Sequence, residues 1–412
     1  MTSTAPMPGA AVRPADGEPL RAFASYSWKA PADIESIARL VIELRLRGFV
    51  TFRDAEAMPP AGGIEAVIRA ELARSTVFVP YLTPDSLESD PVVDLEFHTA
   101  AELRRLQGSP VVLPVARNLG TDRNKLTTAT WARLQHDFSA QWNTFPGPGD
   151  GPLDLADAAA HANNALRASF AEGAGPADGC WELGLATRGE RPPPTQLTVD
   201  ATGLVGGPDA RAGSLEDWER IFAGLCDLKR ALTAHGRRRR ILLRPACHLS
   251  AALAVGWVFR RAAGWRLEVA HEDVECRSSD TLEHPGLVVT RDYGAFSARG
   301  GRLVVCIDLV PRGIRDSVIR AQAAAPRAVL SISAADGSLR IPVDELGAMA
   351  GAAAAAIKDL RGETHAEEVA LYLASPAPFA ALLGAEFGAL GCPLLLHEHD
   401  NATYQPSIVI PG

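Results

Sequence analysis

The sequence predicts an α/β protein built from two domains, each with a mainly parallel sheet. The chain has 412 residues, which is long for a single domain. Short apolar runs alternate with stretches of helical periodicity over residues 20–170, and the same rhythm returns after residue 194. Such β-α alternation is typical of parallel sheets that helices cover on both faces.

The first region opens with an apolar run at 22–26, which predicts a strand, and a helical pattern at 33–46. Gly48 is expected to end that helix. The loop at 53–63 contains Pro59 and Pro60 and is not expected to form regular structure. The other elements follow in the same rhythm: strands at 49–52, 76–81 and 110–116, and helices at 64–74, 92–106 and 154–170.

Residues 171–194 are rich in glycine and proline and are interpreted as a linker or domain entry. The α/β rhythm then resumes. The predicted elements of the second region are strands at 196–200, 240–243 and 266–269 and helices at 214–235 and 250–263.

The second region also contains a weak internal repeat. Sliding Ile241 onto Val369 aligns two segments that each show a strand, a polar turn, an apolar helix and a further strand. The repeat indicates two similar α/β units in tandem with a cleft at their junction. The alternative is that any two strand–helix–strand units share this much by chance. The register pairs Gly256 with Gly384, Phe259 with Phe387 and His271 with His399.

Charge and composition exclude several classes of partner. The net charge is −8, whereas long DNA or RNA needs a broad basic surface; a small nucleotide needs only a local basic pocket. The longest apolar stretch, Gly347–Ile357, is too short to cross a membrane. The N-terminus lacks a signal pattern, and the six scattered cysteines form no CxxC pair. We therefore expect a cytoplasmic protein with no structural metal, no membrane contact and no long nucleic acid.

Three motifs in the first region occur in a recognisable order. They are FASYSWKAPAD (Phe23–Asp33), RGFVTFRDAEAMPPAGGI (Arg47–Ile64) and STVFVPYLTPDSLESDPVVDLEFHTAAEL (Ser75–Leu103). Together they resemble the first strand and loop, the second strand and BB loop, and the third strand and glutamate-bearing helix of TIR domains. The resemblance implies a TIR domain over residues 20–170, with a flavodoxin-like sheet and hydrolysis of the nicotinamide–ribose bond of NAD⁺.

The family's catalytic glutamate falls on Glu96. The tryptophan usual near the start of that helix is replaced by the local sequence Pro91-Val92-Val93. A carboxylate suits this reaction because positive charge develops on the ribose as nicotinamide leaves. The alternative for Glu96 is an exposed helix carboxylate that faces Arg104 or His98.

Further NAD⁺ contacts are expected from the first loop and the start of the BB loop. Tyr26 and Trp28 are candidates for stacking on a ring, and Ser27 and Lys29 for binding the diphosphate; core packing or plain surface charge are the alternatives. Arg53 and Asp54 match polar positions of the BB loop and could equally organise it. NAD⁺ is expected as a substrate and no cofactor is predicted; the sequence also lacks a GxGxxG fingerprint between a strand and a helix.

The second region carries RRRRILLRPACHLSAALAVGWVFRR (Arg237–Arg261) and HEHDNATYQPSIVI (His397–Ile410). These segments resemble the SAVED domain, a fusion of two CARF-like Rossmann-type units that senses cyclic oligonucleotides. The resemblance covers residues 195–412. The order of TIR followed by SAVED is that of effectors in cyclic-oligonucleotide anti-phage systems (CBASS), and a cyclic tri-adenylate is the favoured activator.

A cyclic oligonucleotide needs donors for its phosphates and flat side chains for its bases. His248 and Ser250 could alternatively only cap a helix. A metal site at His397 and His399 is disfavoured because no third ligand has suitable spacing. Polar and flanking positions of the strand–helix turns and of the chain end form the predicted ligand set: Arg244, His248, Leu249, Ser250, Ser375, His397, His399 and Tyr404.

Two classes of function remain. In the first, the activator lines chains up head to tail in a helical filament through TIR–TIR and SAVED–SAVED contacts, and neighbouring TIR domains complete an NAD⁺-cleaving site. In the second, the TIR domain is a non-enzymatic adaptor that assembles on nucleotide binding. Glu96 favours the enzyme.

Overall fold

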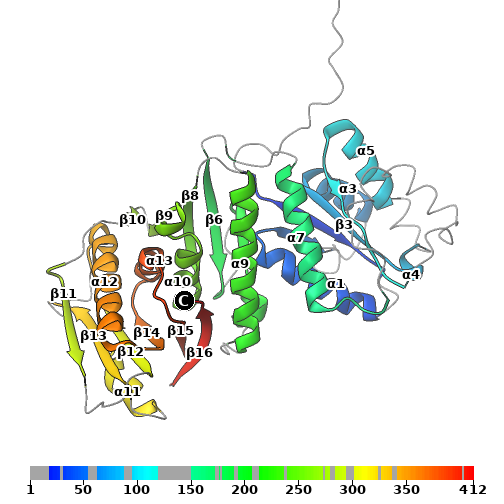
Figure 1. The fold of residues 1–412 in the computed structure, drawn as a ribbon. Helices are drawn as coiled ribbons and strands as arrows, with labels where there is room; N and C mark the ends of the chain where they lie inside the picture. Colours follow the sequence, from blue (N-terminus) through cyan, green and yellow to red (C-terminus); the bar gives the residue numbers. More distant parts are fainter. Residues whose placement is uncertain are drawn as a thin grey trace, which may run out of the picture. The chain divides into compact units, whose positions relative to one another are not determined.

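The computed structural model (Figure 1) divides into two compact α/β units, which are described separately. The N-terminal unit comprises Met1–Ala177 and Pro194–Thr198, and the C-terminal unit comprises Asp178–Pro193 and Val199–Gly412. The structure describes residues 18–27, 31–53, 63–87, 95–118, 150–171, 176, 179–189, 194–206, 213–235, 239–271, 274–278, 284–293, 301–322, 326–335, 341–400 and 403–412.

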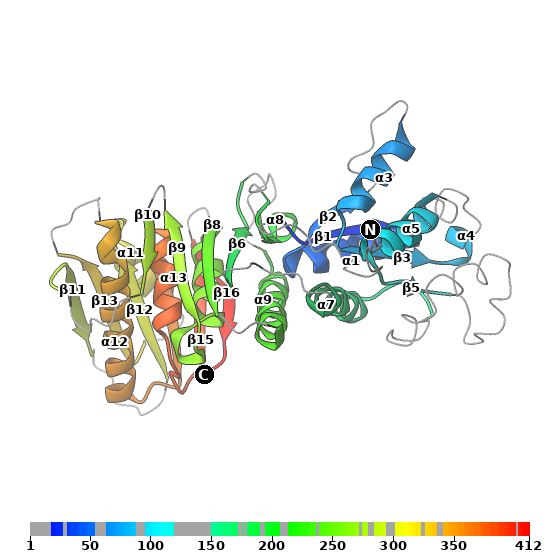
Figure 2. The same cartoon turned by 90° about the horizontal axis from the view of Figure 1, so that it is seen from above.

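The N-terminal unit is built on a parallel sheet of order β2-β1-β3-β4, with β5 also paired to β3. All six residues of the central strand β3 are buried. Helices α1 and α7 pack side by side (Figures 1 and 2). The elements are β1 (Arg21–Ser25), α1 (Pro31–Leu46), β2 (Val50–Arg53), α3 (Ile64–Arg74), β3 (Val77–Leu82), α4 (Pro84–Leu87), α5 (His98–Gln107), β4 (Val111–Val112), β5 (Val115–Ala116) and α7 (Leu155–Ala171).

Two local features of this unit follow directly from the sequence. Gly48 has φ 93°, a left-handed conformation that ends α1 as predicted. Phe78 on β3 packs edge-on against Phe23 on β1 and against Phe97, with ring centroids 5.8 and 5.3 Å apart. Phe97 therefore fixes the start of α5 against the centre of the sheet.

The C-terminal unit contains two sheets, of order β10-β9-β8-β6-β7 and β11-β13-β12-β14-β15-β16. Their strands and helices are β6 (Cys180–Ala186), β7 (Leu197–Asp200), α8 (Thr202–Val205), α9 (Leu215–His235), β8 (Arg240–Ala246), α10 (Leu249–Val258), η3 (Arg261–Ala263), β9 (Arg266–His271), β10 (Val274–Arg277), β11 (Leu287–Asp292), β12 (Arg302–Asp308), α11 (Ile314–Ala321), β13 (Ala328–Ala334), η4 (Val343–Glu345), α12 (Leu346–Thr364), β14 (Glu368–Ala374), α13 (Ala377–Glu386), β15 (Leu394–Asp400) and β16 (Thr403–Ile410).

The internal repeat predicted from the sequence is present in the fold. Strand β8 and helix α10 recur as β14 and α13 with every bound displaced by 128 positions. In each copy the next strand, β9 or β15, lies parallel to its partner, and a final antiparallel strand closes the edge. The tandem Rossmann-type architecture is therefore confirmed.

The repeat also explains the paired glycines. Helices α10 and α13 pack directly against each other (Figure 1). A Cβ atom on Gly256 would lie 1.8 Å from the carbonyl oxygen of Ala381, and one on Gly384 would lie 2.1 Å from that of Leu253. Only glycine permits the two helix backbones to approach this closely.

Several boundaries differ from the sequence prediction, and the strand predicted at 110–116 is divided into β4 and β5. Strand β6 lies inside residues 171–194, which were assigned to a linker; the glycine- and proline-rich segments on either side of it hid its apolar pattern. The helix predicted at 250–263 ends at Val258, and the separate 3-10 turn η3 follows. The described part of the helix predicted at 92–106 is α5, preceded by a π turn at 95–97. Across the described residues, every helix is too short or too polar to cross a bilayer.

Candidate functional site

The first candidate site lies at the carboxyl edge of the N-terminal sheet. Ser25 ends β1, Thr83 directly follows β3, and Glu96 lies just before α5. In open parallel sheets, ligands bind at the edge where the strands' carboxyl ends meet. The fold therefore brings the predicted catalytic carboxylate to the edge where a substrate is expected.

Glu96 is buried, with 3% of its surface exposed, and its carboxylate accepts a hydrogen bond from the hydroxyl of Ser25. The alternative of an exposed helix carboxylate does not describe this residue. Its neighbour Phe97 is held in the aromatic core, so the backbone at Glu96 is fixed. A buried carboxylate is costly unless its environment compensates it, which makes this position a candidate for chemistry rather than for solubility.

The other predicted NAD⁺ contacts fall into two groups. Tyr26 is 2% and Ser27 is 3% exposed, so the chain stays buried directly after the end of β1. Arg53 donates from Nε to the hydroxyl of Tyr26 at 3.3 Å, and its guanidinium lies 5.5 Å from the centre of that ring. Tyr26 thus anchors the base of the BB loop. Trp28, Lys29 and Asp54 lie outside the described residues.

A second buried carboxylate at this edge was missed from the sequence. Asp33, in the first turn of α1, accepts a 2.7 Å hydrogen bond from the hydroxyl of Thr83. Burial raises the pKa of Asp33, an effect that the hydrogen bond from Thr83 opposes. Thr83 and Ser86 exchange backbone and side-chain hydrogen bonds around α4, so Asp33 ties α1 to the end of β3. In the sequence, Asp33 indicated only the start of a helix and not a buried acid.

The second candidate site lies in the C-terminal unit, where β6 and β8 end and α10 begins. His248 is the N-cap residue of α10, so Ser250 is not the cap. The backbone N–H of His248 donates to the hydroxyl of Thr187 at 2.7 Å, and the same hydroxyl lies 2.7 Å from His248 Nδ1. Burial, and then the charge of Arg188, lower the pKa of His248 to about 4. This imidazole is neutral at physiological pH.

The amino end of α10, where a ligand phosphate was expected, contacts a carboxylate of the protein itself. The backbone N–H of Ser250 donates to Glu398 Oε2 at 3.0 Å, and Arg188 Nη2 donates to Glu398 Oε1 at 3.0 Å. The Ser250 hydroxyl accepts a 2.7 Å hydrogen bond from Ser407 on β16. Sequence reasoning missed Glu398 and Arg188, although strand alternation along β15 separates Glu398 from both flanking histidines.

The predicted residues at the chain end do not share a face with α10. His397 stacks on Tyr372 with ring centroids 4.2 Å apart, and Tyr404 packs edge-on against both Tyr372 and His399. Burial, followed by the charge of Arg302, lowers the pKa of His397 to about 4. The predicted ligand set is therefore divided between the two faces of β15, and only His248, Leu249 and Ser250 lie at the start of α10.

The remaining predicted ligand residues have local partners. Arg244 is exposed and pairs with Glu182 on the neighbouring strand β6. Ser375 is half-buried, and its hydroxyl lies 3.4 Å from the carbonyl oxygen of Pro376. Neither contact brings these side chains to Glu398.

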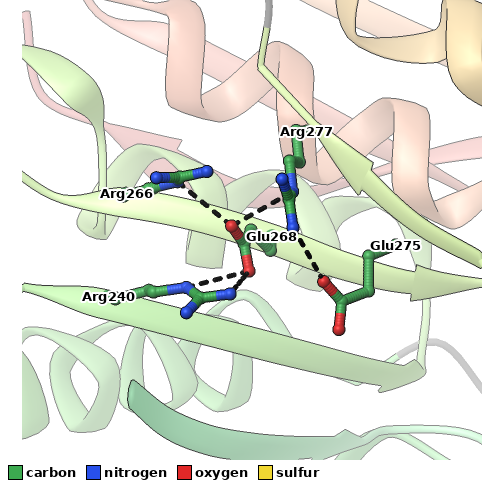
Figure 3. Close-up of polar contacts among 5 residues, drawn as sticks. All are labelled: Arg240, Arg266, Glu268, Glu275 and Arg277. Atoms are coloured by element: carbon green, nitrogen blue, oxygen red, sulfur yellow. Dashed lines mark hydrogen bonds and ion pairs between the residues drawn. The ribbon is translucent and has the colours of Figure 1, made fainter. Parts of the chain in front are cut away.

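Arg240, from the arginine run at 237–240, belongs to a cross-strand network (Figure 3). The carboxylate of Glu268 is fully buried and is contacted by Arg240 Nη2 at 2.5 Å, Arg266 Nε at 3.0 Å and Arg277 Nε at 3.2 Å. Arg277 also reaches Glu275 at 3.2 Å. These arginines join β8, β9 and β10, so a role in holding the sheet accounts for them.

A cavity of about 1040 Å³ lies elsewhere in the C-terminal unit. It runs along the alanine-rich face of α12 and is bordered by Arg261, Arg291 and Lys358. None of the predicted ligand residues lines it. Within the described ranges, no three histidine, cysteine, aspartate or glutamate side chains form a group that could hold a metal ion.

Comparison with known families assigns both regions. Residues 23–145 match the family model of the TIR domain. Residues 225–410 match the model described as the SMODS-associated and fused to various effectors sensor domain, abbreviated SAVED. The first candidate site lies within the former match, and α10 with Glu398 lies within the latter. The N-terminal unit is therefore called the TIR unit below, and the C-terminal unit the SAVED unit.

Curated relatives cover only part of the chain. Over 204 residues it is 23% identical to CD-NTase-associated protein 4 of Acinetobacter sp. and 22% identical to the protein of the same name from Moraxella osloensis. Each alignment covers 49% of this chain and 43% of the relative, so less than half the length of each relative is matched.

Two solved structures align with most of this chain at low identity. The Acinetobacter baumannii Cap4 SAVED/CARF-domain containing receptor, solved with the cyclic trinucleotide 2′3′3′-cAAA, aligns with a TM-score of 0.48 at 13% identity, covering 82% of this chain and 81% of that one. The Moraxella osloensis Cap4 receptor aligns with a TM-score of 0.44 at 14% identity, covering 84% of each chain.

Proposed function

The chain is a TIR–SAVED protein, and we propose that it is an effector of cyclic-oligonucleotide anti-phage signalling whose TIR domain hydrolyses NAD⁺ when the SAVED domain binds its activator. The observation that carries this proposal is the union of the two domains in one chain with a buried glutamate at the carboxyl edge of the TIR sheet. A cyclic tri-adenylate is the first activator to test.

The chemistry of the TIR site follows from Glu96. The bond between ribose C1′ and the nicotinamide nitrogen breaks, and its electron pair leaves with nicotinamide. The carboxylate of Glu96 binds the ribose hydroxyls and stabilises the positive charge that develops on the sugar. Water then adds to C1′ and loses a proton, which gives ADP-ribose. Nicotinamide is a good leaving group because it is cationic in NAD⁺, so no strong general acid is needed.

The hydrogen bond from Ser25 serves this chemistry by orientation. Ser25 is the last residue of β1, and its hydroxyl donates to the Glu96 carboxylate. A carboxylate held by a fixed donor loses less freedom when it binds substrate. Tyr26 and Arg53 fix the adjoining base of the BB loop, which is the segment expected to change when TIR domains assemble.

Activation is proposed to occur by assembly. Binding of the activator to SAVED favours head-to-tail contacts between chains, and the resulting filament brings TIR domains together. This coupling requires that the activator bind the assembled state more tightly than the free chain. A non-enzymatic adaptor, whose TIR domain only recruits other TIR proteins, is the second candidate. The sequence departs from the TIR pattern at Pro91-Val92-Val93, which replaces the tryptophan usual near the start of the glutamate-bearing helix.

The full-length protein is incubated with NAD⁺ and a panel of cyclic oligonucleotides, and nicotinamide release is measured. We expect release that depends on one activator. Glu96→Gln should lower this release by about 10²-fold or more, because the substitution removes the charge that stabilises the ribose cation. Activator binding and assembly should be unchanged.

The matched control is Glu102→Gln, which neutralises an exposed carboxylate on the same helix α5. This variant should keep the turnover of the native protein. Turnover by Glu96→Gln close to that of the control would refute the catalytic assignment. Activator-dependent assembly without any loss of NAD⁺ would select the adaptor.

A further inference from the structure

Glu398 is a buried acid on β15 at the start of α10. Only 5% of its side chain is exposed, and its two oxygens accept from Ser250 N–H and Arg188 Nη2, each at 3.0 Å. Arg188 lies two residues after the end of β6 and contacts this carboxylate, while half of its side chain is exposed. The guanidinium is therefore held by a buried acid in a side chain that solvent still reaches.

The fold does not require a carboxylate at this place. The repeat displaced by 128 positions puts Ala270 of β9 where β15 has Glu398. The first copy forms its strands and packs against α13 with a methyl group at that point. The same architecture is thus built with and without the acid.

Stability does not account for Glu398 either. Burial raises its pKa, and this effect exceeds the opposing effects of Ser250 and Arg188. Ion pairs with a buried partner often stabilise a fold no better than apolar residues of the same volume. The contact with Arg188 does have a geometric consequence, because an arginine held by a carboxylate presents its remaining N–H donors in a fixed direction.

Two groups near Arg188 that could otherwise bind a phosphate are engaged with protein atoms. The neighbouring His248 accepts no proton at neutral pH and is engaged with Thr187. The Ser250 N–H already donates a hydrogen bond to Glu398, so a ligand phosphate is not expected at that amide. Among the described residues, the half-exposed Arg188 places a charged donor at the carboxyl ends of β6 and β8, which is the edge where ligands of parallel sheets bind.

We infer that Arg188 binds a phosphate of the SAVED ligand and that Glu398 is the positioning residue that orients it. The ligand class is an anion with phosphodiester or phosphate oxygens, which match the planar fork of the guanidinium. The inference rests on the proposed function for the identity of the natural ligand. The role of Arg188 toward phosphate does not depend on it.

The test measures binding to the full-length protein by calorimetry with two probes, cyclic tri-adenylate and inorganic pyrophosphate. Arg188→Ala should weaken binding of each probe by about tenfold, the usual loss for one charge-assisted hydrogen bond. Glu398→Gln should weaken binding about fivefold because the arginine is no longer oriented. In the double variant, the Gln substitution should cause no further loss, since its effect passes through Arg188.

The matched control is Arg302→Ala with Glu368→Gln, a pair that joins the amino ends of β12 and β14 with half-exposed side chains. It should leave both affinities unchanged, and thermal unfolding should show that all variants fold. Tighter binding by Glu398→Gln would overturn the inference, because Glu398 would then be a competing anion. Equal losses with and without Arg188 would also overturn it, because they would indicate a purely structural role.

The two probes separate this inference from the proposed function. Pyrophosphate binding that is lost in Arg188→Ala, together with no binding of cyclic oligonucleotides, would retain the anion site and refute the proposed activator. Native protein that binds neither probe would refute the anion site itself.

Discussion

The two copies of the repeat in the SAVED unit share their packing and differ in their polar contacts. In both copies a strand, a helix and a second parallel strand recur at a displacement of 128 positions, and a glycine lies where the helices meet. Among the described residues, the start of α10 is contacted by an acid, Glu398, which Arg188 also contacts, and no such contact is found at the start of α13. The helix packing that the copies share is therefore required by the fold, whereas the polar contacts that differ between them are candidates for function.

The comparison extends to the residue that follows each helix start. Ser250 of α10 corresponds to Pro378 of α13, which has no N–H to donate. The first copy thus retains a donor and a hydroxyl at the point where the second has neither. The two copies therefore present different polar groups at their helix starts.

The largest expected effect is a loss of folding stability when the packing between α10 and α13 is disturbed. Gly256→Ala and Gly384→Ala should each lower the free energy of unfolding by about 3 kcal/mol or more, because the added methyl group would overlap a backbone carbonyl that cannot move independently. Equal losses at the two positions would support the equivalence of the copies. Denaturant unfolding of the SAVED unit, followed by circular dichroism, gives the measurement.

Gly362→Ala is the control for the glycine substitutions. This glycine lies in α12, and a Cβ atom there would meet no atom within 4 Å. The substitution should be neutral or should stabilise the unit by about 0.5–1 kcal/mol, since alanine is the better helix former. A small effect at Gly256 or Gly384 would mean that the helices do not cross as described.

The next-largest effect is the loss of stability in acid that two buried histidines cause, one in each copy of the repeat. Burial lowers the pKa of His248 and of His397 to about 4, against an ordinary value near 6.5. The unfolded chain therefore binds more protons between pH 6.5 and 4, so stability present above pH 6.5 is lost as the pH falls through this window. At pH 5 each histidine should cost about 2 kcal/mol relative to pH 7.5.

His248→Gln and His397→Gln should each flatten the decline of SAVED stability with acid. The raised pKa of Glu398 acts in the opposite direction, so the native slope should be smaller than the histidines alone would give. His161 in α7, whose pKa burial also lowers to about 4, provides the control. His161→Gln should change acid stability in the TIR unit only, as measured by hydrogen exchange resolved to each unit.

The sequence predicted the N-terminal unit and the repeat because their signals were local. Apolar runs and helix ends located the main strands and helices there, and α3 at Ile64–Arg74 matches its predicted bounds. No element was predicted over residues 274–364, where β10, β11, β12, α11, β13 and α12 lie. The register that pairs Gly256 with Gly384 predicted the repeat, whereas the close packing of α10 against α13 that requires both glycines was found only in the fold. Strand β6 was missed because its seven residues lie between two segments that resemble a linker.

The sites were less predictable because they depend on contacts across the chain. The TIR motifs located Glu96, yet nothing local indicated that Ser25 would reach it across 71 positions. Glu398 was passed over for its neighbours His397 and His399, although alternation along β15 directs it to the opposite face. Arg188 lies 210 positions from Glu398, so their pairing could be found only in the fold.

The smallest expected effect concerns the hydrogen bond between Ser407 and Ser250 at the start of α10. Ser407 is fully buried and donates to the hydroxyl of Ser250 at 2.7 Å. Ser407→Ala would leave that hydroxyl without this donor, so the free energy of unfolding should fall by about 1–2 kcal/mol. Ser375→Ala, at the start of α13, should change it by less than about 0.5 kcal/mol because its hydroxyl makes only a long local contact. Equal losses from the two variants would mean that the copies are alike in polar contacts as well as in packing, and the asymmetry assigned to the start of α10 would have to be abandoned.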